Sequence, residues 1–161
     1  MAAPAQRRLR FALDTNVLID LGEGLPFAQR FLAAYRNSGL VASPTVVQEL
    51  VAIAGSALKA QPHAMTALSN MRRWNIQPID LISVGHGITG INAEKLIGSG
   101  ILAEGEVNDG LILIETALIG VPSLISSDKH LLTINPVLLV KKLEEFDLPP
   151  VTIYSPKDFL R

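Results

Sequence analysis

The sequence predicts an α/β fold with a mainly parallel sheet, and two observations support this class. Short apolar runs alternate with helical patterns along the chain, as in parallel sheets whose strands are connected by helices. The chain has 161 residues, a length that fits one domain of ~150 residues. We therefore expect one domain over residues 9–161, preceded by a loose segment at residues 1–8.

Five short apolar runs predict the strands of this sheet. Each is shorter than an ordinary helix, and polar or turn-forming residues follow it. Because strands and helices alternate, successive strands are expected to run in the same direction. The predicted strands are residues 9–13, 40–42, 76–79, 121–126 and 151–154.

Apolar residues at helical spacing predict the connecting helices. One helix opens at Ser43-Pro44, with Ser43 expected as the N-cap and Pro44 as the first helical residue. In the helix that begins at Pro62, the apolar side from Met65 to Trp74 is expected to pack in the core. Residues 129–145 show the weakest pattern. Further helices are expected at residues 17–21, 27–35, 91–97, 105–119 and 128–133.

The composition excludes several classes of site. Cysteine is absent, which excludes disulfides, thiolate zinc sites and cysteine nucleophiles. The histidines are His63, His86 and His130, and their wide separation argues against a histidine-built zinc site. The formal net charge is −1, so any binding of nucleic acid must depend on local basic groups rather than on an overall positive charge.

A membrane protein is also not expected. A spanning helix needs ~20 largely apolar residues, and Glu115 and Pro122 interrupt the most apolar segment, residues 111–125. The arginines near the N-terminus are followed by too few apolar residues for a signal peptide. We expect a soluble, cytoplasmic protein.

Two acidic residues follow predicted strands directly. Asp14 comes after residues 9–13 and Asp128 comes after residues 121–126. Ligands of open α/β sheets bind beyond the carboxyl ends of the strands, so both carboxylates are well placed for function. Each of them could instead cap the helix that follows it.

Three further acids lie near predicted helix starts. Glu106 and Asp109 share one face at the beginning of the most apolar helix, where the alternative role is a favourable interaction with the helix dipole. Glu49 borders the apolar stripe of the helix opened by Ser43-Pro44, where the alternative is an ordinary solvated side chain. Several carboxylates around one point need a cation, and all-oxygen ligands favour Mg²⁺ or Mn²⁺. Such a site is typical of phosphoryl transfer.

Four segments contain the candidate acids, namely Leu13–Asp20, Ser43–Leu50, Asn108–Ala117 and Leu124–Asp128. In this order they resemble the motifs of the PIN domain family. The opening motif is the most specific, and the second and last are short. Two features depart from the family: Glu115 stands where a small residue is more common, and residues 57–100 match no pattern.

The resemblance implies a central parallel sheet of about five strands with helices on both faces. It also implies a metal-dependent endoribonuclease that uses Mg²⁺ or Mn²⁺ to cut RNA, leaving a 5′-phosphate and a 3′-hydroxyl. It further implies a homodimer and, in many relatives, the toxin of a toxin–antitoxin pair with an antitoxin protein as partner. The implied catalytic and metal-binding residues are Asp14, Glu49, Asp109 and Asp128, with Glu106 as a further ligand, direct or through water, and with Asn16 and Ser126 orienting the carboxylates.

Two other functions stay open from the sequence. One is a PIN-like module that binds RNA or a protein without cutting. The other is nucleotide binding at Gly85–Gly90, which matches the dinucleotide fingerprint G-x-G-x-x-G. Residues 81–84 could form a strand before it, but no convincing strand ending in an acid follows. A glycine-rich loop is therefore the expected structure of residues 85–90.

Overall fold

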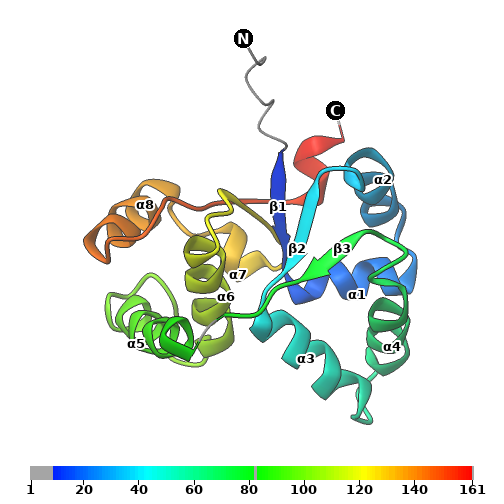
Figure 1. The fold of residues 1–161 in the computed structure, drawn as a ribbon, viewed down its shortest axis with the longest axis horizontal. Coiled ribbons are helices and arrows are strands. Elements are labelled where there is room, and N and C mark those ends of the chain that lie inside the picture. Colours follow the sequence, from blue (N-terminus) through cyan, green and yellow to red (C-terminus); the bar gives the residue numbers. More distant parts are fainter. Residues whose placement is uncertain (1–8, 82, 161) are drawn as a thin grey trace.

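A parallel sheet forms the centre of the molecule (Figure 1). The computed structural model describes residues 9–81 and 83–160, so the predicted loose segment at residues 1–8 lies outside the described residues. The strand order is β3-β2-β1-β4-β5, and every neighbouring pair is parallel. The predicted α/β class with five strands is confirmed. The strands are β1 (Arg10–Leu13), β2 (Gly39–Ala42), β3 (Ile76–Pro78), β4 (Ser123–Ile125) and β5 (Thr152–Tyr154).

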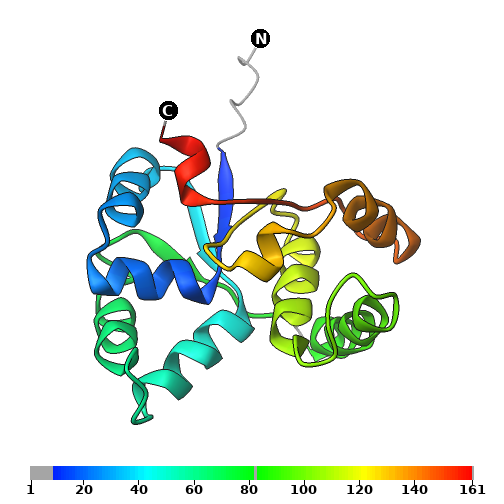
Figure 2. The same ribbon diagram turned by 180° about the vertical axis from the view of Figure 1, so that it is seen from behind.

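Helices lie on both sides of this sheet. Helices α1, α2 and α4 lie on one side, and α5, α6 and α8 lie on the other (Figures 1 and 2). None of the helices in the described part of the chain is long and apolar enough to cross a membrane. The helices are α1 (Thr15–Glu23), α2 (Pro26–Tyr35), α3 (Pro44–Ala54), α4 (Gln61–Asn70), α5 (Ser83–Gly98), α6 (Val107–Leu118), α7 (Lys129–Leu132), α8 (Pro136–Glu145) and the 3₁₀ helix η1 (Pro156–Phe159).

The sheet has a topological switch point between β1 and β4. From β1 the chain proceeds to β2 and β3 on one side of the sheet, and later to β4 and β5 on the other. Leu13 pairs with Ile125, and the backbone N–H of Asp14 donates to the carbonyl of Ile125 at 2.9 Å. The segments that follow β1 and β4 therefore separate just after Asp14 and Ile125. Open α/β sheets form their ligand crevice at such a point.

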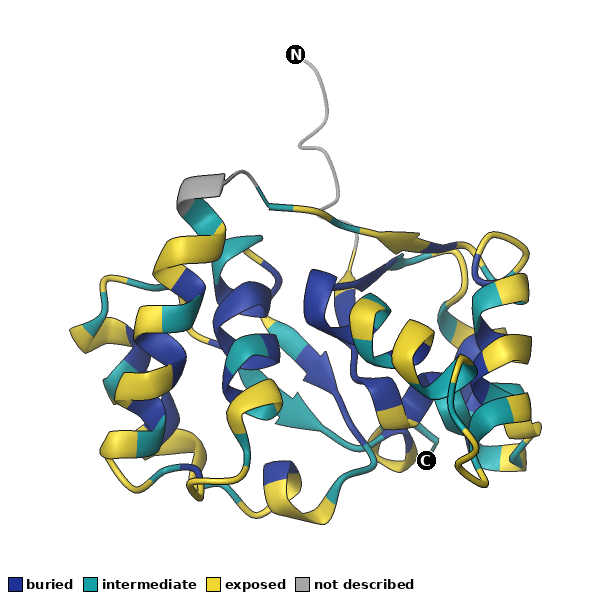
Figure 3. Ribbon diagram, turned by 90° about the horizontal axis from the view of Figure 1, so that it is seen from below, coloured by how far each residue is buried: buried dark blue, intermediate teal, exposed yellow. Residues whose placement is uncertain are grey.

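The core lies between the sheet and the inner faces of the helices (Figure 3). Helix α6 is the most buried, with Leu113, Ile114 and Ala117 fully enclosed, as its strongly apolar sequence predicts. On the other side, Phe11 of β1 packs edge-to-face against Phe31 and Phe159. These contacts hold the sheet between its two layers of helices.

Helices α1 and α4 approach each other closely at Gly22. A Cβ atom at this position would clash with the backbone carbonyl of His63, so the contact requires glycine. The buried residues of α4 are correspondingly small, namely Ala64 and Ala67. Of the apolar side that was expected to pack in the core, Met71 is buried, and Leu68 and Trp74 are partly buried against the core. The expectation is wrong for Met65, whose side chain is 50% exposed because the buried face of α4 runs through Ala64 and Ala67 instead.

The expected glycine-rich loop at residues 85–90 is also wrong. These residues lie inside α5, which begins at Ser83, and neither a strand nor a phosphate-binding turn precedes the glycines in the described residues. Thr89, Ala93 and Leu96 are buried at helical spacing, so packing against neighbouring structure overrides the poor helix propensity of glycine. The region of weak pattern at residues 129–145 contains α7 and α8.

Candidate active site

Asp14 connects the end of β1 to the start of α1. As the N-cap of α1, it accepts a hydrogen bond at Oδ1 from the Thr15 backbone N–H at 2.8 Å. Its other oxygen, Oδ2, accepts from the Ser126 hydroxyl at 2.7 Å. The side chain is only 3% exposed, and this burial raises the pKa of Asp14 to about 7 against the opposing effect of these hydrogen bonds. Asp14 therefore caps a helix and also lines the pocket described below.

The loop after β4 places Asp128 opposite Asp14. The Ser126 hydroxyl accepts a 3.0 Å hydrogen bond from the Asp128 backbone N–H, while the Asp128 side chain caps α7 by accepting from the His130 backbone N–H. Asn16 donates to the other carboxylate oxygen of Asp128 at 3.3 Å. Asn16 and Ser126 were predicted to orient the carboxylates. Asn16 contacts the carboxylate of Asp128, and Ser126 contacts the carboxylate of Asp14 and the backbone of Asp128.

Glu49 reaches the same region from α3. The Thr15 hydroxyl donates to its Oε2, and the Asn108 side-chain amide donates to its Oε1 at 2.7 Å. These donors come from the first turns of α1 and α6. Both oxygens of Glu49 are therefore oriented by neighbouring helices, and the side chain is not an ordinary solvated glutamate.

Asp109 lies in the first turn of α6 and is half-buried. No side-chain hydrogen bond reaches its carboxylate among the residues described. Burial, followed by the negative charges of Asp128, Glu106 and Glu49, raises the pKa of Asp109 to about 6, and only His130 acts in the opposite direction. Among the pocket acids, Asp109 is consequently the one whose negative charge is stabilised by the fewest neighbouring groups.

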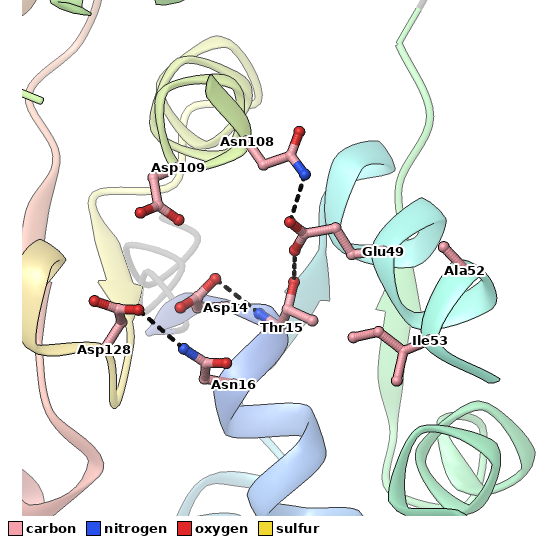
Figure 4. A pocket seen from close by; sticks show the side chains of 9 residues that line it. All are labelled: Asp14, Thr15, Asn16, Glu49, Ala52, Ile53, Asn108, Asp109 and Asp128. Atoms are coloured by element: carbon pink, nitrogen blue, oxygen red, sulfur yellow. Dashed lines mark hydrogen bonds between the residues drawn. The ribbon is translucent and has the colours of Figure 1, made fainter. Parts of the chain in front are cut away.

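All four predicted catalytic acids line one pocket (Figure 4). The pocket has a volume of about 380 Å³ and opens at the switch point of the sheet. Asp14, Asp109 and Asp128 point toward a common space, with Glu49 beside it (Figure 4). No lysine or arginine is among its lining residues, which are Asp14, Thr15, Asn16, Glu49, Ala52, Ile53, Asn108, Asp109 and Asp128.

Glu106 lies in an adjoining hollow rather than in this pocket. The hollow, of about 470 Å³, shares Glu49, Asp109 and Asp128 with the pocket and adds Glu106 and His130. Oε1 of Glu106 is 3.3 Å from Nδ1 of His130, and Oε2 accepts a hydrogen bond from the Ala103 backbone N–H. In this arrangement Glu106 faces His130, at the margin of the acidic pocket.

The chemistry of the pocket fits a hard divalent cation. Its charged side chains are all carboxylates, which suit Mg²⁺ and Mn²⁺. Burial, with neighbouring negative charges, raises the pKa values of Asp14 and Asp109, and a bound cation would favour their charged forms. Within the described residues, no three acidic or histidine side chains are arranged to hold an ion as they stand. An ion would therefore have to draw the carboxylates inward.

Sequence reasoning assigned no role to Thr15, Asn108 or His130. Thr15 and Asn108 bind Glu49, and His130 faces Glu106. Thr15 and Asn108 each lie next to a predicted acid, within the segments that resemble PIN motifs. This position next to an acid could have marked Thr15 and Asn108 as site residues. Their hydrogen-bond partner, however, depends on how α1, α3 and α6 meet.

Comparison with known proteins gives similarity in structure only. No family model matches the chain, and no curated protein matches its sequence.

Solved structures, in contrast, match nearly the whole chain. VapBC2 from Rickettsia felis, bound to a DNA fragment from the promoter, matches with a TM-score of 0.60 and 17% identity, covering 91% of this chain and 98% of that chain. DNA-bound VapBC from Salmonella typhimurium matches with a TM-score of 0.59 and 15% identity, over 92% and 98%. VapBC-1 from nontypeable Haemophilus influenzae matches with a TM-score of 0.55 and 20% identity, over 92% and 99%. Such identities show the fold alone, and this chain therefore has a PIN-like fold.

Proposed function

We propose that this protein is a metal-dependent endoribonuclease that hydrolyses RNA phosphodiester bonds with Mg²⁺ or Mn²⁺. The observation that carries the proposal is the pocket at the switch point, which Asp14, Glu49, Asp109 and Asp128 line without a lysine or arginine among them. The PIN-like fold supports the same activity. Carboxylates gathered in this way are typical of sites that bind metal ions for phosphoryl transfer.

In this proposal, Asp14, Glu49, Asp109 and Asp128 hold the ion, and Glu106 assists from the adjoining hollow. When bound, the ion supplies water activation and neutralises negative charge on the phosphate. Ser126 and Asn16 keep Asp14 and Asp128 in place through the hydrogen bonds described above. Such supporting contacts orient metal ligands and raise affinity.

Two further residues, Thr15 and Asn108, have a similar supporting role. Thr15 and Asn108 hold one oxygen each of Glu49, so that rotation of the Glu49 side chain away from the pocket would cost both hydrogen bonds. We propose direct hydrolysis, without a covalent enzyme intermediate, that leaves a 5′-phosphate and a 3′-hydroxyl.

The proposal also includes association with other protein chains. The similar structures are VapBC complexes, two of them with DNA, and we propose that this chain acts as the toxin of a toxin–antitoxin pair and forms a homodimer. Exposed apolar side chains, including Ile91 of α5 and Val137 of α8, are available for such contacts. Sedimentation of the purified chain, alone and with the product of an adjacent small reading frame, tests both associations.

A cleavage assay tests the activity. Purified protein is incubated with structured and unstructured RNA in Mg²⁺, Mn²⁺ or a chelator, beside the Asp14→Asn variant. We expect cleavage by the wild type only with a divalent ion, products with 5′-phosphate ends, and no cleavage by Asp14→Asn. RNA binding without cleavage under every condition would instead support a non-catalytic binding module.

A further inference from the structure

Glu115 is a buried carboxylate outside the acidic pocket. It lies in the middle of α6, a strongly apolar helix, and is only 2% exposed. Its sequence neighbours Ile114 and Thr116 are fully buried. A carboxylate in such surroundings is costly unless it is hydrogen-bonded, so its contacts indicate why the fold tolerates it.

The partner of Glu115 is Thr45, at the start of α3. The Thr45 hydroxyl donates to Oε1 of Glu115 at 2.7 Å, and the Thr45 backbone N–H lies 3.2 and 3.3 Å from the two carboxylate oxygens. Burial raises the pKa of Glu115, and these hydrogen bonds oppose the rise. Both groups that Thr45 offers therefore point to one side chain on another helix, 70 residues away.

Glu115 also takes the place of a missing helix cap. The sequence predicts Ser43 as the N-cap of α3, and Ser43 does occupy that position, but its side chain makes no capping hydrogen bond. The first N–H groups of a helix need acceptors and favour negative charge. The Glu115 carboxylate provides both from α6, so that the N-terminus of α3 is tied to a different helix.

The two helices joined in this way carry pocket residues. Glu49 lies four positions after Thr45 on α3, about one turn further along. Asp109 lies six positions before Glu115 on α6. A second contact between the same helices is the 2.7 Å hydrogen bond from Asn108 to Glu49 inside the pocket. The buried contact thus lies beyond the pocket on the helices that contribute Glu49 and Asp109.

We propose that Glu115 is a positioning residue that fixes α3 against α6 and thereby sets the separation between Glu49 and Asp109. Its effect on catalysis rests on the proposed nuclease function, whereas its effect on helix spacing does not. Thr45 acts with it as the donor. A cap from within α3 would stabilise that helix equally well but would not determine where α3 lies relative to α6.

Spin labels measure the spacing directly. The chain has no cysteine, so cysteines introduced at Val51 of α3 and Val107 of α6, which are 56% and 47% exposed, carry the only labels. In this background we compare Glu115→Ala, Thr45→Val and the conservative Thr45→Ser. Thr116→Val is the matched control, because its buried hydroxyl bonds only the Ile112 carbonyl within α6.

We expect Glu115→Ala and Thr45→Val to shift or broaden the label-to-label distance distribution, and Thr45→Ser and Thr116→Val to leave it unchanged. In unlabelled protein, Mn²⁺ affinity measured by calorimetry is expected to fall ~10-fold or more for the first two variants. In the cleavage assay, kcat is expected to fall while KM for RNA changes little.

An unchanged distance distribution and unchanged Mn²⁺ affinity in both Glu115→Ala and Thr45→Val would overturn the proposal and leave Glu115 with a stabilising role only. If Glu115→Ala does not fold, Thr45→Val, which keeps the side-chain shape, decides the question. Absence of cleavage by the wild type would reject the nuclease function but not the spacing result, so the two failures are distinguishable.

Discussion

The hydroxyl of Ser126 donates a 2.7 Å hydrogen bond to Asp14 across 112 residues of sequence. The same hydroxyl accepts from the backbone N–H of Asp128. One small side chain therefore joins the loops after β1 and β4 at the switch point, and it holds two of the pocket acids in a fixed relationship.

Replacing Ser126 by alanine is expected to raise the pKa of Asp14 above its value of about 7, because the Ser126 hydrogen bond lowers that pKa. The Asp14 carboxylate would then be protonated at neutral pH in a larger fraction of molecules. A carbon-detected NMR titration of Asp14 in the metal-free protein measures the shift, and the pH profile of RNA cleavage should move upward in parallel. An unchanged Asp14 titration would show that the hydroxyl does not control this acid.

The free energy of unfolding of the metal-free protein is expected to fall between about pH 4 and pH 7. The folded pKa values of Asp14 and Asp109 are raised from 3.8 to about 7 and about 6. Stability from a raised pKa is complete below the unfolded value and is lost as the pH rises through the folded value, here by on the order of a few kcal/mol. Urea unfolding across this range measures the loss.

Asp14→Asn and Asp109→Asn provide the control for that profile. Each variant removes one of the titrating groups, so its stability should depend less on pH than that of the wild type. A wild-type stability that stays constant from pH 4 to pH 7 would mean that the pocket carboxylates are compensated in a way the structure does not show.

Asn108→Ala is expected to lower kcat for RNA cleavage by ~10-fold, because supporting contacts of this kind contribute that much to metal sites. The substitution removes the donor to Oε1 of Glu49 and leaves only the Thr15 hydroxyl to orient that carboxylate. Asn70→Ala is the matched control, since the Asn70 amide is exposed and bonds only Thr66 within α4. Equal activity of the two variants would contradict a role for Asn108 at the site.

Gly22→Ala is expected to destabilise the fold by ~1–3 kcal/mol, because the added Cβ meets the backbone of His63 and forces α1 from α4. Gly87→Ala provides the comparison. A Cβ at Gly87 meets nothing within 4 Å, so alanine in α5 should be neutral or stabilise by ~0.5–1 kcal/mol. Thermal melting of both variants checks the pair, and a destabilised Gly87→Ala would indicate that residues 85–90 are not helical.

The strands and most helices were predictable because their signals are local. The run from Leu9 to Leu13 needs no partner to be read as a strand, and β1 follows it within one residue. Asp14 and Asp128 were predictable site candidates for a related reason, since parallel strands bring their carboxyl ends to one edge. Pattern and topology together thus indicated the edge of the sheet where the acids lie.

The remaining features depend on contacts between helices. Gly85–Gly90 reads as a loop from composition, yet it is helical because α5 packs through Thr89 and Ala93. Met65 is exposed because the buried face of α4 runs through Ala64 and Ala67 instead, and the spacing of the larger apolar residues does not indicate that face. The contact between Glu115 and Thr45 likewise follows from how α3 and α6 cross, which the sequence of either helix alone does not contain.

The measurement that tests the central claim most directly is a calorimetric titration of the metal-free protein with Mn²⁺, with Asp14→Asn beside it. The titration is done at pH 8, which is above the pKa values of Asp14 and Asp109, so that both side chains are in the ionised form that binds Mn²⁺. We predict saturable binding by the wild type and an affinity at least ~10-fold weaker in Asp14→Asn, because the variant lacks one ligand. No saturable binding by the wild type, or equal binding by both proteins, would contradict the assignment of this pocket as a metal site.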